Sequence, residues 1–209
     1  MIKIENIEVM GWEHAIKGMR NPMNSWSKSD SYHESGGYVV GPNDLDLMER
    51  LAAGGSTHAK YRRMIVVYMD VTAPLYWWKE ADTYKVGTVA NSCSTMHKIT
   101  SKPIEMSDFS IDDFHILSEG IYITDFFTTV VEDCEMLRQK YLETKEKKYW
   151  KALIQLLPCS YNQKRTLMLN YEVLSHMYHD RKDHKLTEWR EFCQMIKALP
   201  YSQIITMEE

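Results

Sequence analysis

A run of mostly apolar, β-branched residues at positions 63–71 (Arg-Met-Ile-Val-Val-Tyr-Met-Asp-Val) constrains the fold of this chain more than any other feature. Side chains that branch at Cβ favour extended backbone, and a strand that is apolar at nearly every position needs cover on both faces. The sequence therefore predicts a central strand at 63–71. A second strand is predicted at residues 2–9, where apolar and polar residues alternate with a period of two.

Apolar residues spaced three and four apart predict helices on both sides of the central strand. The longest such pattern covers residues 122–144, and the charged residues 145–148 that follow are expected to form a solvated hinge or helix face. Residues 21–31 and 86–100 are rich in turn-forming or hydroxyl-bearing residues and are expected to be loops. The other predicted helices are at 12–19, from the start signal at 41–44 to the stop at 54–55, at 73–82 with Pro74 in the first turn, and at 150–157, 167–178 and 186–199.

Together these patterns predict an α+β fold with a helical C-terminal half. The chain has 209 residues and no low-complexity tract, so one α+β domain over residues 1–209 is the expected organisation.

The composition excludes several classes of protein. A net charge of −4 argues against binding nucleic acid through bulk positive charge. No apolar run reaches the roughly 18 residues of a membrane span, and the first residues lack the apolar stretch of a signal peptide. Four scattered cysteines do not make a disulfide framework. We therefore expect a cytoplasmic protein. The 14 Met and 6 Trp are compatible with a ring-shaped ligand, with self-association or with an ordinary core.

Common nucleotide-binding and catalytic motifs are absent from the sequence. It contains no P-loop, no Rossmann glycine fingerprint after a strand and no Gly-x-Ser-x-Gly elbow. His176, His179 and His184 lie close together with two aspartates between them, but their spacing matches no standard metal motif. We therefore expect solvated histidines and no metal.

Residues 73–98 combine aromatic rings, cations and many hydroxyl groups. Stacking rings, charges that pair with phosphate and polar groups that read a base edge are what a nucleotide or a flavin needs. The alternative is that the aromatic residues 76–78 belong to the core and the Ser/Thr-rich run is a surface loop.

This region resembles the flavin-dependent thymidylate synthases. The Val-x-Ala-Pro lead-in of that family is matched by residues 71–74, and Lys79-Glu80 falls at its Arg-Gln. The family signature then runs Arg-His-Arg, two residues, Ser, one residue, Asn, two residues, Ser, one residue, Arg. Thr83-Tyr84-Lys85 replaces Arg-His-Arg. At the later positions of the signature, Thr88 stands for the first Ser. Asn91 lies one place late for the Asn, and Ser92 or Ser94 stands for the second Ser.

Near the C-terminus, Glu188-Trp189-Arg190 resembles the family's Glu-x-Arg after a helix. Arg181 lies within one residue of the position of a nucleotide-binding Arg in the family. The resemblance extends over residues 44–198 in element order.

The resemblance implies the fold of the thymidylate synthase complementing proteins: a twisted, mainly antiparallel sheet packed with helices. It further implies a homotetramer that binds FAD and dUMP and methylates dUMP with methylenetetrahydrofolate and NADPH, without a catalytic side chain. Carried over residue by residue, the cofactor-binding residues are Lys79, Tyr84, Lys85 and Asn91, and the substrate-binding residues are Thr88, Ser92, Ser94, Arg181 and Arg190.

The departures from the signature open a second hypothesis. Thr83 carries no charge, and Lys85 is a point charge without the guanidinium fork. Lys79, Lys98, Arg20 and Arg181 are candidate compensating cations. The alternative function is a catalytically inactive, phage-related homologue that acts as a nucleotide-binding or protein-binding regulator or inhibitor.

Overall fold

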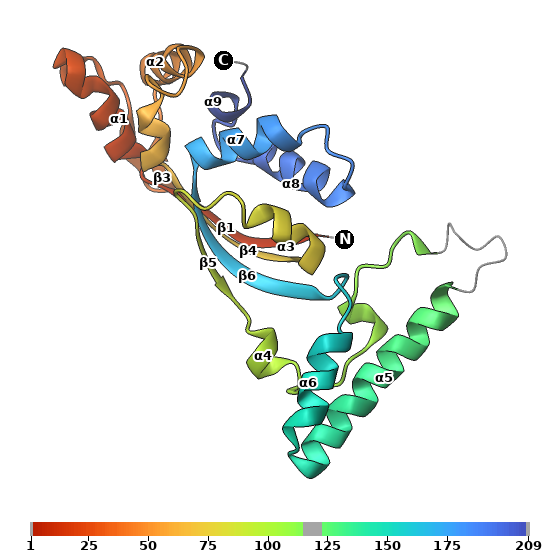
Figure 1. The fold of residues 1–209 in the computed structure, drawn as a ribbon. Coiled ribbons are helices and arrows are strands. Elements are labelled where there is room, and N and C mark those ends of the chain that lie inside the picture. The colour runs from red at the N-terminus through yellow and green to blue at the C-terminus, as the bar shows by residue number, and fades with distance from the viewer. Residues whose placement is uncertain (1, 115–122, 208–209) are drawn as a thin grey trace. The chain divides into compact units, whose positions relative to one another are not determined.

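The computed structural model describes residues 2–114 and 123–207, which form a mixture of helices and antiparallel sheet. Within these residues, four strands make one sheet in the order β1 (Lys3–Met10), β4 (Val66–Pro74), β6 (Asn162–Asn170) and β5 (Val89–Ser92) (Figure 1). A separate antiparallel hairpin joins β2 (Tyr32–Glu34) to β3 (Gly37–Val39). The predicted α+β class with a mainly antiparallel sheet is confirmed.

The predicted helices are largely present. The 3₁₀ turns are η1 (Asn21–Met23), η2 (Trp26–Lys28), η3 (Lys60–Met64) and η4 (Met106–Asp108). The α-helices are α1 (Trp12–Arg20), α2 (Pro42–Ala53), α3 (Leu75–Ala81), α4 (Thr95–Lys98), α5 (Ile123–Thr144), α6 (Lys147–Leu156), α7 (Tyr171–Arg181), α8 (Thr187–Ala198) and α9 (Gln203–Thr206). The predicted start of the longest helix at Tyr122 lies outside the described residues.

The central strand was predicted three residues too early. Strand β4 runs from Val66 to Pro74, while Arg63 and Met64 belong to the 3₁₀ turn η3. Pro74 therefore ends the strand and does not open the helix. The backbone N–H groups of the first two residues of α3, Leu75 and Tyr76, instead donate to the carbonyls of Tyr161 and Cys159.

The prediction of a helix over 167–178 was wrong in its first four residues. Strand β6 continues to Asn170, with Leu167 and Leu169 buried on one face. The side chain of Asn170 then accepts a hydrogen bond from the N–H of Val173 and caps α7. Strand β5 and the β2–β3 hairpin were not predicted either.

Of the predicted hinge at residues 145–148, only 145 and 146 lie between two packed helices, and 147–148 begin α6. Lys145 has a φ of 57° and ends α5, and α6 begins two residues later at Lys147, so residues 150–157 do not continue α5. Helix α6 packs against α5 through a buried cluster that includes Phe127, Val131, Cys134 and Leu153.

The described part of the chain divides into two compact units. Unit 1 holds residues 2–3, 71–81 and 91–165, and unit 2 holds residues 4–70, 82–90 and 166–207, in each case without the undescribed positions. Strands of the sheet pass from one unit into the other. The single-domain organisation stays a prediction. No helix of the described residues has the length and apolar character that a membrane crossing requires.

A buried ion pair fixes the polar loop at residues 21–31 in unit 2. Arg20 Nε lies 2.6 Å from Asp44 Oδ1, and both side chains are at most 5% exposed. Asp44 Oδ2 also accepts hydrogen bonds from the hydroxyls of Ser29 and Ser31, each at 2.6 Å. Burial alone would raise the pKa of Asp44, but these hydroxyls and Arg20 lower it below its ordinary value. The Arg20 guanidinium is therefore already paired with a carboxylate inside the fold.

We expect Asp44→Asn to lower the free energy of unfolding by about 3 kcal/mol at pH 7, because it leaves a buried guanidinium without its counter-charge. The pKa of Asp44 is lowered in the folded state. The carboxylate therefore contributes to the free energy of unfolding at neutral pH, and this contribution is lost as the pH falls below 3.8. Urea unfolding of both proteins at several pH values measures this.

Asp46→Asn is the matched control, since Asp46 pairs with Arg50 on the surface of the same helix, with both side chains at least 65% exposed. It should cost less than about 1 kcal/mol. Equal losses in the two variants would contradict a special role for the Asp44 pair.

Candidate functional site

The segment that resembles the family signature is divided between the two units. Tyr84, Lys85 and Thr88 lie in unit 2, in the turns between α3 and β5. Lys79, Asn91, Ser92 and Ser94 belong to unit 1.

In unit 2, Tyr84 and Arg181 meet in a hydrogen-bonded aromatic cluster. Tyr84 Oη donates to Asp180 Oδ2 at 3.0 Å and accepts from Arg181 Nε at 2.9 Å. The guanidinium carbon of Arg181 also lies 4.9 Å from the ring centroid of Trp189, in cation–π geometry. Burial and the neighbouring Asp180 raise the pKa of Tyr84, although Arg181 opposes this, so the phenol stays a neutral donor. The structure thus brings together two predicted residues, Tyr84 and Arg181.

Arg190 holds the turn between α7 and α8. Its Nη1 donates to the carbonyls of His184 and Lys185 at 2.7 and 2.9 Å, and its Nη2 donates to Thr187 Oγ1 at 2.9 Å. These three contacts position the turn that precedes Trp189.

Gly87 lets the signature segment approach the start of α7. Its φ is +79°, and a Cβ at this position would lie 2.8 Å from Asn170 Nδ2. Next to it, the Thr88 hydroxyl is buried and has no hydrogen-bond partner among the residues that the structure describes. Lys85, two residues before Gly87, is exposed. This short segment therefore carries two polar groups that form no hydrogen bond or ion pair within the described chain, the Lys85 ammonium and the Thr88 hydroxyl.

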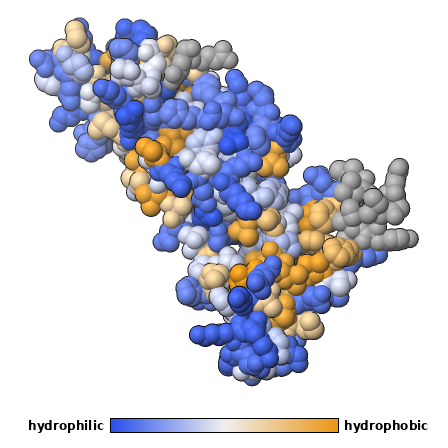
Figure 2. Space-filling view, in the orientation of Figure 1, coloured by the Kyte–Doolittle hydropathy of each residue, from blue (hydrophilic) through white to orange (hydrophobic). Residues whose placement is uncertain are grey.

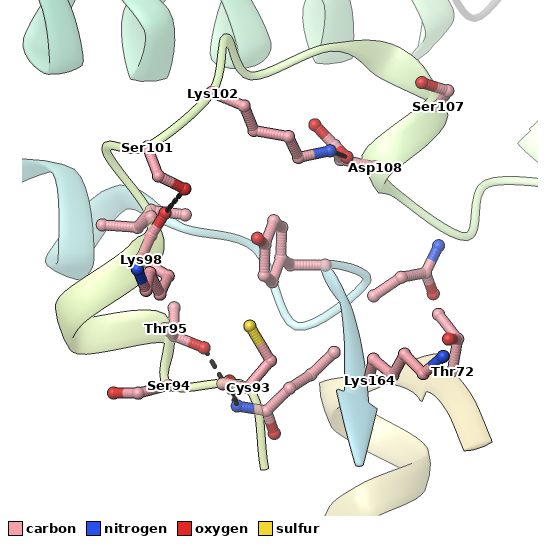
Figure 3. Close-up of a pocket in the computed structure, with 14 residues that line it drawn as sticks. Thr72, Cys93, Ser94, Thr95, Lys98, Ser101, Lys102, Ser107, Asp108 and Lys164 are labelled. Carbon is pink, nitrogen blue, oxygen red and sulfur yellow. Dashed lines mark hydrogen bonds and ion pairs between the residues drawn. The ribbon is translucent and has the colours of Figure 1, made fainter. Parts of the chain in front are cut away.

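In unit 1, a cleft of about 390 Å³ opens between the end of β5, helix α4, residues 99–108 and the first residues of β6 (Figure 3). Its lining carries three lysines, one aspartate and several hydroxyl groups. Lys102 reaches across to form an ion pair with Asp108, as Figure 3 shows. Cys93 also lines the cleft, and its sulfur points toward the middle of it. Two residues singled out from the sequence lie in this lining: Ser94, predicted to bind substrate, and Lys98, a candidate compensating cation.

The remaining predicted residues of unit 1 lie outside this cleft. Asn91 and Ser92 are exposed on β5, whose four side chains all face solvent. Lys79 Nζ lies 3.6 Å from Cys159 Sγ. Trp77 and Trp78 are at most 2% exposed, so these two rings belong to the core, as the alternative interpretation of this segment held.

Sequence reasoning did not assign Cys93, Lys102, Tyr161 and Lys164 to a site. A signal for Cys93 exists: counting the signature without gaps from Thr83 puts Cys93 at the second Ser and Thr95 at the final Arg. No comparable signal marks Lys164, which lies 71 residues further along the chain and reaches the cleft only because β6 lies beside β5.

A second cavity lies in unit 2 between α1, η1, α2 and η3, with a volume of about 570 Å³. Its lining is mainly apolar, with Met19, Met23, Leu47, Leu51 and Met64, and its rim includes His58 and Lys60. Among the described residues, no group of three or more His, Cys, Asp or Glu side chains is placed to hold a metal ion.

Comparisons with solved structures show the fold. Thymidylate synthase X (ThyX) from Helicobacter pylori, crystallised with FAD and dUMP, aligns with 100% of this chain and 98% of its own at 15% identity and a TM-score of 0.70. A second structure of that enzyme complexed with FAD and dUMP covers 97% and 98% at 14% identity and a TM-score of 0.68. The UMP/dUMP methylase PolB from Streptomyces cacaoi, bound with 5-Br dUMP, covers 98% and 94% at 13% identity and a TM-score of 0.63.

The chain therefore has the fold of the flavin-dependent thymidylate synthases over its whole length. No protein-family model matches the sequence, and no curated protein matches it.

We expect Gly87→Ala to lower the free energy of unfolding by about 1–3 kcal/mol, because the new methyl group meets the capping side chain Asn170 and the backbone is left-handed. Thermal unfolding measures the loss. Gly36→Ala is the control, since nothing lies within 4 Å of its Cβ position. If both variants unfold at the wild-type temperature, the close approach at Gly87 is not a constraint.

Proposed function

We propose that this protein binds a pyrimidine nucleotide, dUMP or a close relative, at a site that also takes FAD. The observation that carries the proposal is the end-to-end likeness of fold to solved structures that hold dUMP or 5-Br dUMP, two of which also hold FAD. The residues that would contact the nucleotide are Thr88, Ser92, Ser94 and Arg181, with Arg190 holding the turn next to Trp189. The unpartnered hydroxyl of Thr88 supports this assignment, since a buried polar group that lacks a partner is satisfied when a ligand supplies one.

The residues proposed for FAD fit the polar parts of that group. Lys85 and Asn91 are exposed and offer an ammonium for the pyrophosphate and an amide for a ring edge. Lys79 is a second exposed cation. Tyr84 would hold the segment in place and would not donate its own hydrogen bond to FAD, because its hydroxyl is already bonded to Asp180 and Arg181.

When bound, FAD would supply hydride after reduction by NADPH, so that a methylene group from methylenetetrahydrofolate becomes the methyl group of the product. The protein's own residues would bind and orient the two ligands. We assign no catalytic side chain.

One observation favours a second candidate, a homologue that binds nucleotide or protein as a regulator without flavin chemistry. The central residue of the signature, Tyr84, is used inside the fold by its two hydrogen bonds. A pocket that has lost both guanidinium groups and the imidazole of the signature binds a pyrophosphate more weakly.

The test is calorimetric titration of the purified protein with dUMP, and with deoxyuridine as the ligand that lacks phosphate. We expect saturable binding of dUMP, with deoxyuridine weaker by about tenfold or more because the charge-assisted contacts are lost. An absence of dUMP binding in the presence and absence of FAD would overturn the proposal. Reconstitution with FAD decides between the two candidates, since bound flavin absorbs near 450 nm and only the first candidate retains it.

Lys85→Ala should weaken FAD binding by about tenfold, because it removes one charge-assisted contact to the pyrophosphate. Lys151→Ala is the control, since Lys151 is an exposed lysine of α6. Equal FAD affinity in the two variants would exclude a role for Lys85 in cofactor binding.

We also propose a homotetramer. Figure 2 shows hydrophobic surface over the α5–α6 pair, and the exposed apolar residues of these helices include Phe126 at 71% and Met136 at 50% exposure. Such a surface is typical of a contact between proteins. Light scattering at micromolar concentration should give about four times the chain mass of 24.6 kDa, whereas a monomer at that mass would contradict the proposal.

The cytoplasm is the proposed location. Cys93 and Cys159 are exposed free thiols, which persist in a reducing compartment. Cell fractionation tests this, and recovery with secreted proteins would contradict it.

A further inference from the structure

The second cavity lies in unit 2 and shares no residue with the segment that resembles the family signature. Its lining comes from residues 18–64 alone, mainly on α1, η1, α2 and η3. Five of the lining side chains are Met or Leu, and each of the five is at least partly exposed. The volume of about 570 Å³ lies within the range of sites that bury a small organic molecule.

Two methionines of this lining leave apolar surface open to water. Met23 is 82% exposed and Met64 is 43% exposed. Apolar surface that is open to water becomes more stable when the apolar body of a ligand covers it. Methionine side chains adapt their shape to a ligand, and their sulfur atoms make favourable contacts with aromatic rings. The interior of the cavity therefore suits an aromatic ring system.

The walls of the cavity are held in place by contacts within unit 2. Tyr61 Oη donates to the Met48 carbonyl at 2.7 Å, which joins η3 to α2. The Met64 side chain lies against Gly18 of α1, where a Cβ would be 3.0 Å from the Met64 sulfur. The buried ion pair described above joins the last residue of α1 to the first turn of α2. Walls that are fixed in this way reduce the ordering cost of binding.

The charged groups of the lining favour an anion. Lys60 is the only Lys or Arg among the described residues that line the cavity, and none of these residues is Asp or Glu. The Lys60 ammonium forms no hydrogen bond or ion pair with another described residue. His58 also lines the cavity, and its ring packs against Gly54, where a Cβ would be 3.2 Å from His58 Cδ2. A single negative charge complements this lining, whereas a second one would enter an apolar interior without a partner.

We propose that the second cavity binds an aromatic monocarboxylate. The rings lie among the Met and Leu side chains, and the carboxylate pairs with Lys60. The site goes beyond the proposed function, because none of its lining residues is among those assigned to dUMP or FAD.

Calorimetric titration of the full chain tests both parts of the ligand, with biphenyl-4-carboxylate as the probe and biphenyl-4-carboxamide as its uncharged counterpart. We expect one carboxylate molecule to bind per chain. The amide should bind about tenfold more weakly, because the charge-assisted contact is lost. An absence of saturable carboxylate binding, or equal affinity for the two compounds, would overturn the proposal.

Lys60→Gln should weaken carboxylate binding by about tenfold and leave the affinity for the amide unchanged. Lys17→Gln is the matched control, since Lys17 is an exposed lysine of α1 outside the lining. Both lysines are exposed, so the fold is expected to persist, and circular dichroism checks it. Carboxylate affinity that is equal in the two variants would overturn the assignment of Lys60.

Methionine oxidation locates the bound probe. Hydrogen peroxide converts exposed methionine to its sulfoxide, and peptide mass spectrometry follows each position. Saturating biphenyl-4-carboxylate should slow oxidation of Met23 and Met64 by about threefold or more, because the rings cover their sulfur atoms. Met10 is 40% exposed on β1 and lies outside the lining, so it should be oxidised at one rate throughout. Unchanged oxidation of both Met23 and Met64 would place the probe elsewhere and overturn the proposal.

Competition with dUMP separates this site from the one in the proposed function. Saturating dUMP should leave the affinity for biphenyl-4-carboxylate unchanged. Displacement of the carboxylate by dUMP would mean that the two share one site, which would overturn this inference and leave the proposed function standing. Protection of Met23 and Met64 by the carboxylate in a protein that does not bind dUMP would support this site and contradict the proposed function.

Discussion

The alternation of buried and open side chains along β4 is the constraint on which the sheet depends. Val67, Met69, Val71 and Ala73 are at most 1% exposed, so a shift of one residue would move this whole set to the opposite face. On that opposite face, Asp70 accepts hydrogen bonds from Asn6 of β1 at 2.9 Å and from Thr166 of β6 at 2.6 Å. One strand thus fixes the register of both neighbours, and through β6 it fixes the edge strand β5 that follows the signature segment.

The contact between Tyr84 and Arg181 explains how a degenerate signature keeps its place in this fold. A hydrogen bond and a cation–π contact attach the turn before β5 to α7 and α8. The Tyr84 hydroxyl, which holds the fold through Asp180 and Arg181, is therefore less available to a ligand.

Elements that bury one face show an apolar periodicity in the sequence, and these were predicted. Strands that exist only because they pair with a neighbouring strand show no such periodicity, and these were missed. Helix α5 shows its apolar spacing over 22 residues and was predicted well. Strand β5 exposes all four side chains, so its strand character comes only from pairing at the sheet edge, which no local pattern shows. Leu167 and Leu169 of β6 lie directly before the apolar residues of α7. The two-residue spacing of the strand is therefore read as part of the three- and four-residue spacing of the helix. For the site, Tyr84 and Arg181 were predicted from the resemblance, whereas Lys164 enters the cleft through strand order alone.

Hydrogen–deuterium exchange with and without dUMP tests the central claim, nucleotide binding at the signature segment and the strand that follows it, most directly. Binding should slow exchange of backbone amides within residues 85–102 and 162–165, because a bound nucleotide covers these segments and reduces their local opening. Residues 12–53, which hold the buried Arg20–Asp44 pair, should exchange at the same rate in both samples. Unchanged exchange over residues 85–102 at a saturating concentration of dUMP would contradict the account.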